Sequence, residues 1–174
     1  MIETPRLIIR PWQESDRVPF AAMGADPEVM AHFPALLSRA ESDAMVDRIG
    51  LMLADQGFGF WAVERRDSGD FIGFCGLNRV NFLCPVAGEV EIGWRLVRAA
   101  WGQGFAREAA QVCLDWGFAH GLTRIVSFTV PANMRSWGLM ERLGMQRRAD
   151  LDFDHPRVAE GSPLKRHSVY EALA

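Results

Sequence analysis

Apolar residues along this chain follow two periods, which is typical of a mixed α and β protein. Spacings of three and four residues predict helices over 14–24, 38–57, 107–120 and 133–143. Shorter runs rich in β-branched and aromatic residues predict strands over 6–10, 58–65, 71–77, 89–97, 124–130, 145–149 and 167–172. Four strands that can pair antiparallel come first, and helices alternate with strands afterwards. This order predicts one α+β domain over residues 1–174.

Local signals support several of these boundaries. Ser38 and Glu41 have the spacing of a capping box, which places the start of the second helix there. Gly57, Gly121 and Gly144 stand where the later helices should end. The segment 67–70, Asp-Ser-Gly-Asp, predicts a hairpin turn between two strands. Residues 81–88 and 152–165 are expected to be loops.

Composition narrows the class of protein. The chain has 174 residues, a net charge of −3, 49% hydrophobic and 24% charged residues, as in a globular domain. This charge gives no general attraction to nucleic acid or membranes, so neither is an expected partner. The three cysteines form no CxxC pair, and the histidines lack metal-ligand spacing. We therefore expect free thiols, no metal, and a cytoplasmic location, since no signal-peptide pattern or bilayer-length apolar run occurs.

The segment 101–106, Trp-Gly-Gln-Gly-Phe-Ala, joins the strand 89–97 to the helix 107–120. The first backbone N–H groups of a helix have no internal partner, and the helix dipole adds positive charge there. Small residues let a ligand approach this backbone closely. Arg95, Arg98 and Arg107 flank the segment with no acid between them. The pattern predicts a site for phosphate or pyrophosphate.

Two common phosphate motifs do not fit this segment. The dinucleotide spacing GxGxxG would need a small residue at position 107, which is Arg107, and an acid about 20 residues downstream, where Leu122 to Arg124 stand. A P-loop would need Gly-Lys followed by Ser or Thr, which is absent. A nucleotide-binding module unrelated to coenzyme A therefore stays a weaker alternative.

Four segments in order resemble the GNAT superfamily of acetyl-CoA-dependent N-acetyltransferases, in particular the branch of ribosomal-protein N-terminal acetyltransferases. They are Thr4–Pro11, Glu91-Ile92-Gly93-Trp94, Trp101–Ala109, and Asn133-Met134-Arg135-Ser136 with Leu143-Gly144-Met145. The segment Phe153-Asp154-His155-Pro156 also resembles a stretch that lies near the acceptor cleft in that branch. One departure is Trp101, where the wider motif often has Gln or Arg.

The resemblance implies a three-layer fold whose mostly antiparallel, twisted sheet has about seven strands and is flanked by helices. It implies that the fourth and fifth strands part, so that the pantetheine arm of acetyl-CoA lies between them. Backbone groups of Trp94, Arg95 and Leu96 would bind this arm, as would Asn133. The pyrophosphate would be bound by backbone N–H groups of the loop residues Gly102, Gln103, Gly104, Phe105, Ala106 and Arg107.

The implied reaction is acyl transfer from a thioester to an amine. The attacking amine must be neutral, although amine pKa values are about 7.7–8.0 for an N-terminus and about 10.4 for lysine. A base is therefore useful, and Glu91 is the first candidate, with Glu89 second. A backbone N–H near Trp94 would stabilise the oxyanion. Ser136 would contact or protonate the sulfur of coenzyme A.

Other roles for these residues are open at this stage. Glu91 could orient substrate or pair with an arginine, Ser136 could pack or cap its helix, and Asn133 could be an N-cap. The leading hypothesis is an acetyltransferase acting on a primary amine, either a small molecule or a protein N-terminus, as a monomer or homodimer. The alternative on the same fold is a non-catalytic acyl-CoA sensor.

Overall fold

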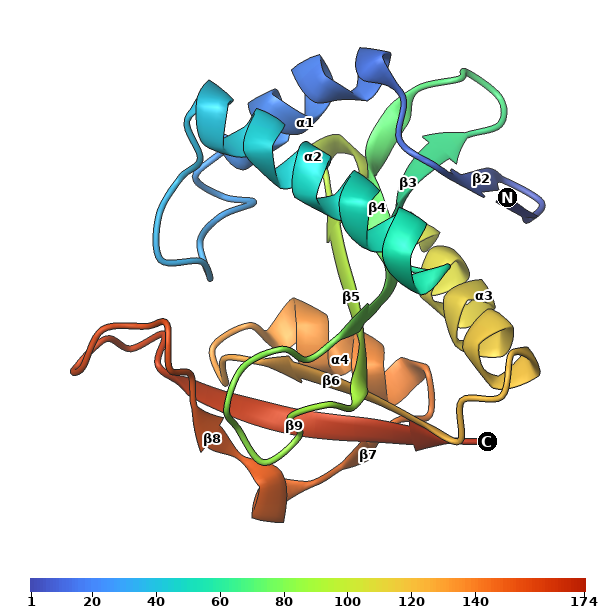
Figure 1. Ribbon diagram of the computed structural model, residues 1–174. Coiled ribbons are helices and arrows are strands. Elements are labelled where there is room, and N and C mark those ends of the chain that lie inside the picture. Colours follow the sequence, from blue (N-terminus) through green and yellow to red (C-terminus); the bar gives the residue numbers. More distant parts are fainter.

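The computed structural model describes residues 1–174 (Figure 1). Its helices are α1 (Arg17–Gly24), α2 (Arg39–Gln56), α3 (Phe105–Ala119) and α4 (Met134–Arg142), with 3-10 turns at Glu14–Asp16, Arg98–Ala100 and Ala149–Leu151. Its strands are β1 (Ile2–Glu3), β2 (Leu7–Arg10), β3 (Phe60–Arg65), β4 (Phe71–Arg79), β5 (Val90–Leu96), β6 (Arg124–Thr129), β7 (Gln146–Arg147), β8 (Phe153–Asp154) and β9 (Arg166–Leu173). The predicted mixed α and β class is confirmed. None of the helices combines the length and hydropathy that crossing a bilayer requires.

All strands belong to one open sheet in the order β1-β2-β3-β4-β5-β6-β9-β7, with β8 paired to β9. Every pairing is antiparallel except that of β5 with β6. This parallel contact is short, because only Val90 pairs with Ile125 and Glu91 with Val126. Figure 1 shows the two strands running apart beyond it. The predicted splay is therefore present.

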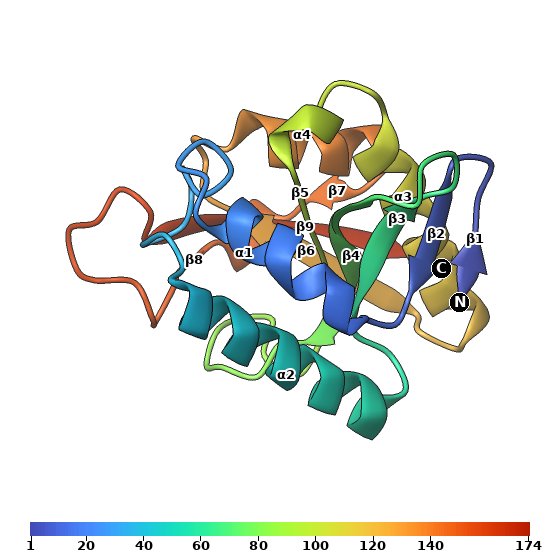
Figure 2. The ribbon, with the colours of Figure 1, turned by 90° about the horizontal axis from the view of Figure 1, so that it is seen from above.

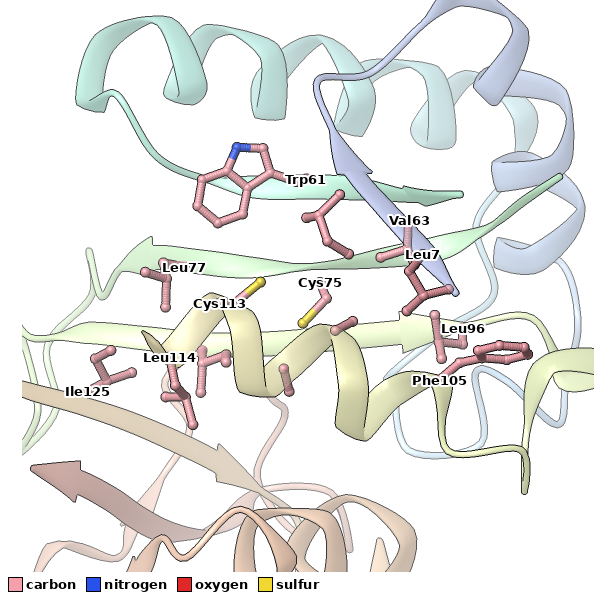
Figure 3. Packing of buried hydrophobic residues seen from close by; sticks show 14 of the residues in the cluster. Leu7, Trp61, Val63, Cys75, Leu77, Leu96, Phe105, Cys113, Leu114 and Ile125 are labelled. Carbon is pink, nitrogen blue, oxygen red and sulfur yellow. The ribbon is translucent and has the colours of Figure 1, made fainter. Parts of the chain in front are cut away.

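Helices cover both faces of the sheet, as Figure 2 shows: α1 and α2 lie on one side, and α3 and α4 on the other. The main core lies under α3, where Phe105, Cys113 and Leu114 pack against sheet residues that include Leu77 and Leu96 (Figure 3). Burying each large apolar side chain contributes about 1.5–3 kcal/mol. Cys75 also lies in this core, so Cys75 and Cys113 are buried free thiols.

The face under α1 and α2 has a smaller apolar cluster, formed by Phe20, Met23, Val29, Val46 and Phe74. Trp12 joins it, stacked edge to face on Phe20, and its indole N–H donates to the carbonyl of Phe60 at 2.8 Å. This cluster holds α1 against β4 and so sets the height of the helices above the sheet.

Differences from the sequence prediction concern short elements. β1, β7 and β8 have two residues each, and β8 lies inside the predicted loop 152–165. Two residues carry too little alternation to show a period. The predicted strand 145–149 is cut short because Ala149–Leu151 form a 3-10 turn. The sheet accordingly has nine strands, where about seven were expected.

A buried ion-pair network joins β2 to the turn before α1. Arg10 is 4% exposed and Asp16 is 1% exposed; the Arg10 guanidinium binds Asp16 at 2.7 Å and Glu64 at 2.7 Å. Removing Asp16 leaves the buried Arg10 with Glu64 as its only carboxylate partner, and breaking a buried pair costs about 3–5 kcal/mol. We expect Asp16→Ala to lower the free energy of unfolding by about that amount, measured by urea denaturation.

The matched control is Asp67→Ala. Asp67 is exposed and pairs with Arg65 at 2.5 Å. An exposed pair contributes only about 0–1 kcal/mol. Equal losses in the two variants would contradict a stabilising role for the buried network.

Candidate functional site

The loop before α3 presents a row of unpaired backbone donors. None of the six N–H groups from Gly102 to Arg107 donates to an acceptor in the protein. Gly102 and Gly104 have φ values of 72° and 81°, in the left-handed region that side chains disfavour. Gly104 is the N-cap of α3, so the helix begins at Phe105, two residues before the predicted start. The loop therefore has the geometry of an anion site at a helix N-terminus.

A contact that sequence reasoning missed supports this loop from the N-terminal strands. Arg6 Nη1 donates to the carbonyl of Gln103 at 2.9 Å, and the same guanidinium pairs with Glu108 at 2.7 Å. Glu108 also accepts from the hydroxyl of Thr4 at 2.6 Å. Residues separated by about a hundred positions thus fix the loop. In the sequence these residues belong to two separate segments, Thr4–Pro11 and Trp101–Ala109, and nothing there shows that the two segments meet.

The fork between β5 and β6 begins next to Glu91. Ser127 of β6 donates its hydroxyl hydrogen to the carbonyl of Ile92 at 3.0 Å, and this is the last contact between the two strands before they part. Odd-numbered residues of β5 direct their backbone groups to β4, as the bonds from Val80 to Glu89 and from Val97 to Ile72 show. The backbone groups of Trp94 and Leu96 therefore face the open side.

This alternation excludes Arg95 from the backbone groups that were expected to bind the pantetheine arm. Arg95 pairs in register with Phe74, so its backbone groups face β4 while its side chain lies on the α1 and α2 face. The carbonyl of Leu96 already accepts from the indole of Trp101 at 2.9 Å. Trp94 accordingly has both backbone groups, and Leu96 its N–H, directed toward the fork.

Glu91 is the acid at the fork. It accepts a hydrogen bond from Asn78 Nδ2 at 2.9 Å, and no arginine lies within ion-pair distance. Burial raises its pKa to about 7, against the smaller opposing effect of the Asn78 hydrogen bond. Glu89, the second candidate, instead pairs with Arg124 at 3.1 Å. Glu91 has no ion-pair partner, and its pKa of about 7 suits a general base.

Residues of β5 divide between the faces of the sheet as the alternation predicts. Val90, Ile92 and Trp94 pack in or against the core under α3. Glu91 and Gly93 share the opposite face with Phe60, whose ring atom Cε1 would lie 3.0 Å from a Cβ at position 93. Glycine at that position lets the Phe60 ring lie directly over the strand beside Glu91.

The start of α4 lies across the fork. Asn133 is the N-cap, accepting from the N–H of Ser136 at 3.3 Å and donating to the hydroxyl of Thr129 at 3.1 Å. The Asn133 side chain thus has a structural role, as one interpretation expected. The half-buried Ser136 hydroxyl makes no hydrogen bond within the protein. Arg135 stacks over the ring of Trp101 at 4.5 Å, which joins α4 to the glycine loop.

A family model described as an acetyltransferase (GNAT) domain matches residues 6–146. The chain belongs to the GNAT acetyltransferase family. An N-acetyltransferase named p20 from Bacillus licheniformis is 30% identical over 151 residues, covering 85% of this chain and 83% of that protein.

Solved structures of acetyltransferases share the fold. An acetyltransferase from Agrobacterium tumefaciens has a TM-score of 0.80 and 25% identity, covering 99% of this chain and 94% of that one. A ribosomal L7/L12 α-N-protein acetyltransferase, solved with coenzyme A, has a TM-score of 0.75 at 16% identity, covering 98% and 95%, and shows likeness of fold alone.

The three arginines that flank the glycine loop before α3 differ in their surroundings. Arg98 forms an ion pair with Glu28 and lies 4.0 Å from Asp26. Arg95 is buried among aromatic rings on the α1 and α2 face. Arg107 is exposed on the first turn of α3 and forms no ion pair. Only Arg107 remains available at the loop as an additional cation.

Aromatic residues of β6 and β8 lie on the same face of the sheet as Glu91. Val126, the register partner of Glu91, belongs to a cluster with Phe153, against which Phe128 packs. The rings of His155 and His167 join it, 5.1 Å apart. Burial lowers the pKa of His155 to about 4 and lowers that of His167, so both are neutral at pH 7. No group of three or more His, Cys, Asp or Glu side chains is placed to hold a metal ion.

Proposed function

We propose that this protein transfers the acetyl group of acetyl-CoA to a primary amine by direct attack, with both substrates bound at once. The observation that carries the proposal is the juxtaposition of the unpaired N–H groups of residues 102–107 with a fork beside Glu91. Membership of the GNAT family supports acetyl-CoA as the donor.

Binding of the donor would use the backbone first. The N–H groups from Gly102 to Arg107 would bind the pyrophosphate, and the Arg107 side chain could add one charge-assisted contact. The backbone groups of Trp94 and the N–H of Leu96 would pair with the amides of the pantetheine arm, as an added strand does. This arrangement would direct the thioester toward Glu91.

The chemistry needs a proton acceptor and an oxyanion donor. Glu91, with a pKa of about 7, would take the proton of the acceptor amine directly or through a water. The neutral amine would then attack the thioester carbonyl, and the Trp94 N–H would stabilise the oxyanion. Collapse of the intermediate would release the thiolate beside Ser136, whose free hydroxyl could donate to the sulfur.

The structural relatives indicate only a general class of acceptor. Structural neighbours include acetyltransferases of ribosomal proteins and a spermidine N-acetyltransferase chimera. These proteins act on protein or small-molecule amines, so the proposal is stated for a primary amine of either kind.

Two measurements test the proposal. Calorimetry should show that acetyl-CoA binds in preference to NAD and ATP, and thiol release from acetyl-CoA should require an added amine. Binding without turnover over a broad amine panel would favour the acyl-CoA sensor instead. Preferred binding of NAD or ATP would contradict both functions.

The contact between Arg6 and the loop gives a further prediction. Arg6→Ala removes the bond to the Gln103 carbonyl and the pair with Glu108, so the loop should be less well ordered before binding. Because ordering then accompanies binding, we expect a Kd for acetyl-CoA raised about 3–10-fold, equivalent to about 0.7–1.4 kcal/mol. Calorimetry measures it, and Arg39→Ala, which removes an exposed pair with Asp43 on α2, is the control. An unchanged Kd in Arg6→Ala would show that the loop needs no support.

A further inference from the structure

Arg95 is a buried cation without a partner. Its residue is 8% exposed, and neither Nε nor Nη1 has a hydrogen-bond acceptor. No carboxylate lies within ion-pair distance of it. The contrast with Arg10 is direct, because that guanidinium, also buried, binds both Asp16 and Glu64.

Aromatic rings enclose the Arg95 guanidinium. Its central carbon lies 4.1 Å from the ring centroid of Phe33 and 5.4 Å from that of Phe74. Phe33 belongs to the segment between α1 and α2, while Phe74 is the register partner on β4. Burial lowers the pKa of Arg95 to about 10, so the side chain remains charged at neutral pH. Stacking on rings recovers only part of the cost of burying a charge.

The position of Arg95 connects it to the proposed reaction. Side chains at 91, 93 and 95 share one face of β5, because alternate residues of a strand point the same way. At about 3.3 Å per residue, Arg95 lies roughly 7 Å from position 93 and roughly 13 Å from Glu91 along the strand. A molecule that extends along this face over the Phe60 ring, with its amine and its anionic group several ångströms apart, can therefore place the amine near the fork and the anionic group at Arg95.

We propose that the acceptor is an amine that also carries a carboxylate, and that Arg95 binds this carboxylate. The inference rests on the proposed acetyl transfer and names its acceptor class. A planar guanidinium matches a carboxylate through two parallel hydrogen bonds. A phosphate would favour several cations, yet the neighbouring Arg98 is already paired with Glu28. A polyamine would be repelled by Arg95.

The test compares matched acceptors. Purified protein is given acetyl-CoA and amino acids whose amine and carboxylate are separated by increasing chain lengths, the same compounds as carboxamides, or spermidine, and thiol release is followed. We expect at least one amino acid to exceed its carboxamide about 10–100-fold in kcat/KM, in line with a charge-assisted bidentate contact. In Arg95→Met this preference should fall to about onefold through a raised KM, whereas Arg95→Lys should keep part of it. Arg98→Met is the matched control and should keep the preference of the unaltered protein.

Stability distinguishes a binding role from a structural one. Arg95→Met replaces an unpaired buried cation with an apolar side chain of similar length, so its Tm should rise. A lowered Tm with an unchanged acid preference would overturn the proposal, as would a preference for carboxamides or spermidine in the unaltered protein.

Calorimetry of amino acid added to the protein with coenzyme A separates the two proposals. Arg95-dependent binding without any turnover would support the carboxylate site and contradict the acetyltransferase function. Turnover of amines regardless of a carboxylate would do the reverse.

Discussion

Glu91→Gln should lower kcat by about 10²–10⁴-fold, the range expected when a general base is lost. The glutamine keeps the size of the side chain and can still accept from Asn78, but it cannot take a proton. In the unaltered protein kcat/KM should fall below pH 7 as Glu91 becomes protonated, since burial sets its pKa at about 7. The variant should lose this fall in kcat/KM below pH 7 and should keep any pH dependence that comes from the acceptor amine. A pH profile of thiol release with one acceptor measures both effects.

Two further observations make the test specific to proton transfer. Glu89→Gln, on the same strand but paired with Arg124, should retain most of the activity. The Kd of acetyl-CoA should be unchanged in Glu91→Gln. A variant that binds acetyl-CoA normally and loses less than about fivefold in kcat would show that Glu91 is not the base.

The raised pKa of Glu91 also has a consequence for stability. Because the folded protein binds this proton more tightly than the unfolded chain, the contribution of Glu91 to stability is greatest at low pH. It is lost as the pH rises from the unfolded value of about 4.3 to about 7. Glu91→Gln should therefore be more stable than the unaltered protein at pH 8 and similar at pH 4, in thermal unfolding.

Gly102→Val should raise the Kd of acetyl-CoA by about 100-fold, which corresponds to about 2.7 kcal/mol. Gly102 has a φ of 72°, and a valine there both strains the backbone and adds bulk beside the unpaired N–H groups. The backbone donors of this loop act only if the phosphate oxygens approach them closely. Calorimetric titration with acetyl-CoA measures the loss.

The hairpin turn between β3 and β4 offers an internal control. Gly69 has a φ of 73°, and a Cβ added there, as at Gly102, would meet no heavy atom within 4 Å. Gly69→Val should therefore carry a similar cost in stability without weakening binding. If both variants bind equally well, the loop does not hold the pyrophosphate.

Sequence alone predicted the fold where patterns were long. The α2 capping box is present as expected, with Ser38 accepting from the N–H of Glu41. The glycine loop and the Glu91 strand were also placed correctly relative to each other, because they are neighbours in the chain. By contrast, the support of the loop by Arg6 depends on contacts across about a hundred residues, which no local pattern encodes.

The chemical state of the site residues was likewise beyond sequence reasoning. Glu89 and Glu91 look alike in the sequence, and only tertiary contacts give one an arginine and leave the other free. Similarly, three nearby arginines have three different environments. Arg98 is paired with an acid, Arg107 is exposed at the loop without an ion pair, and Arg95 is buried without a partner.

The parted strands also bear on how the fold is held together. Along Trp94 and Leu96 the sheet has an internal edge, where backbone groups of one half meet none from the other. If the donor substrate pairs with both halves, the bound metabolite supplies part of the stability of the folded protein. Its resistance to unfolding in a cell would then rise and fall with the supply of coenzyme, by mass action.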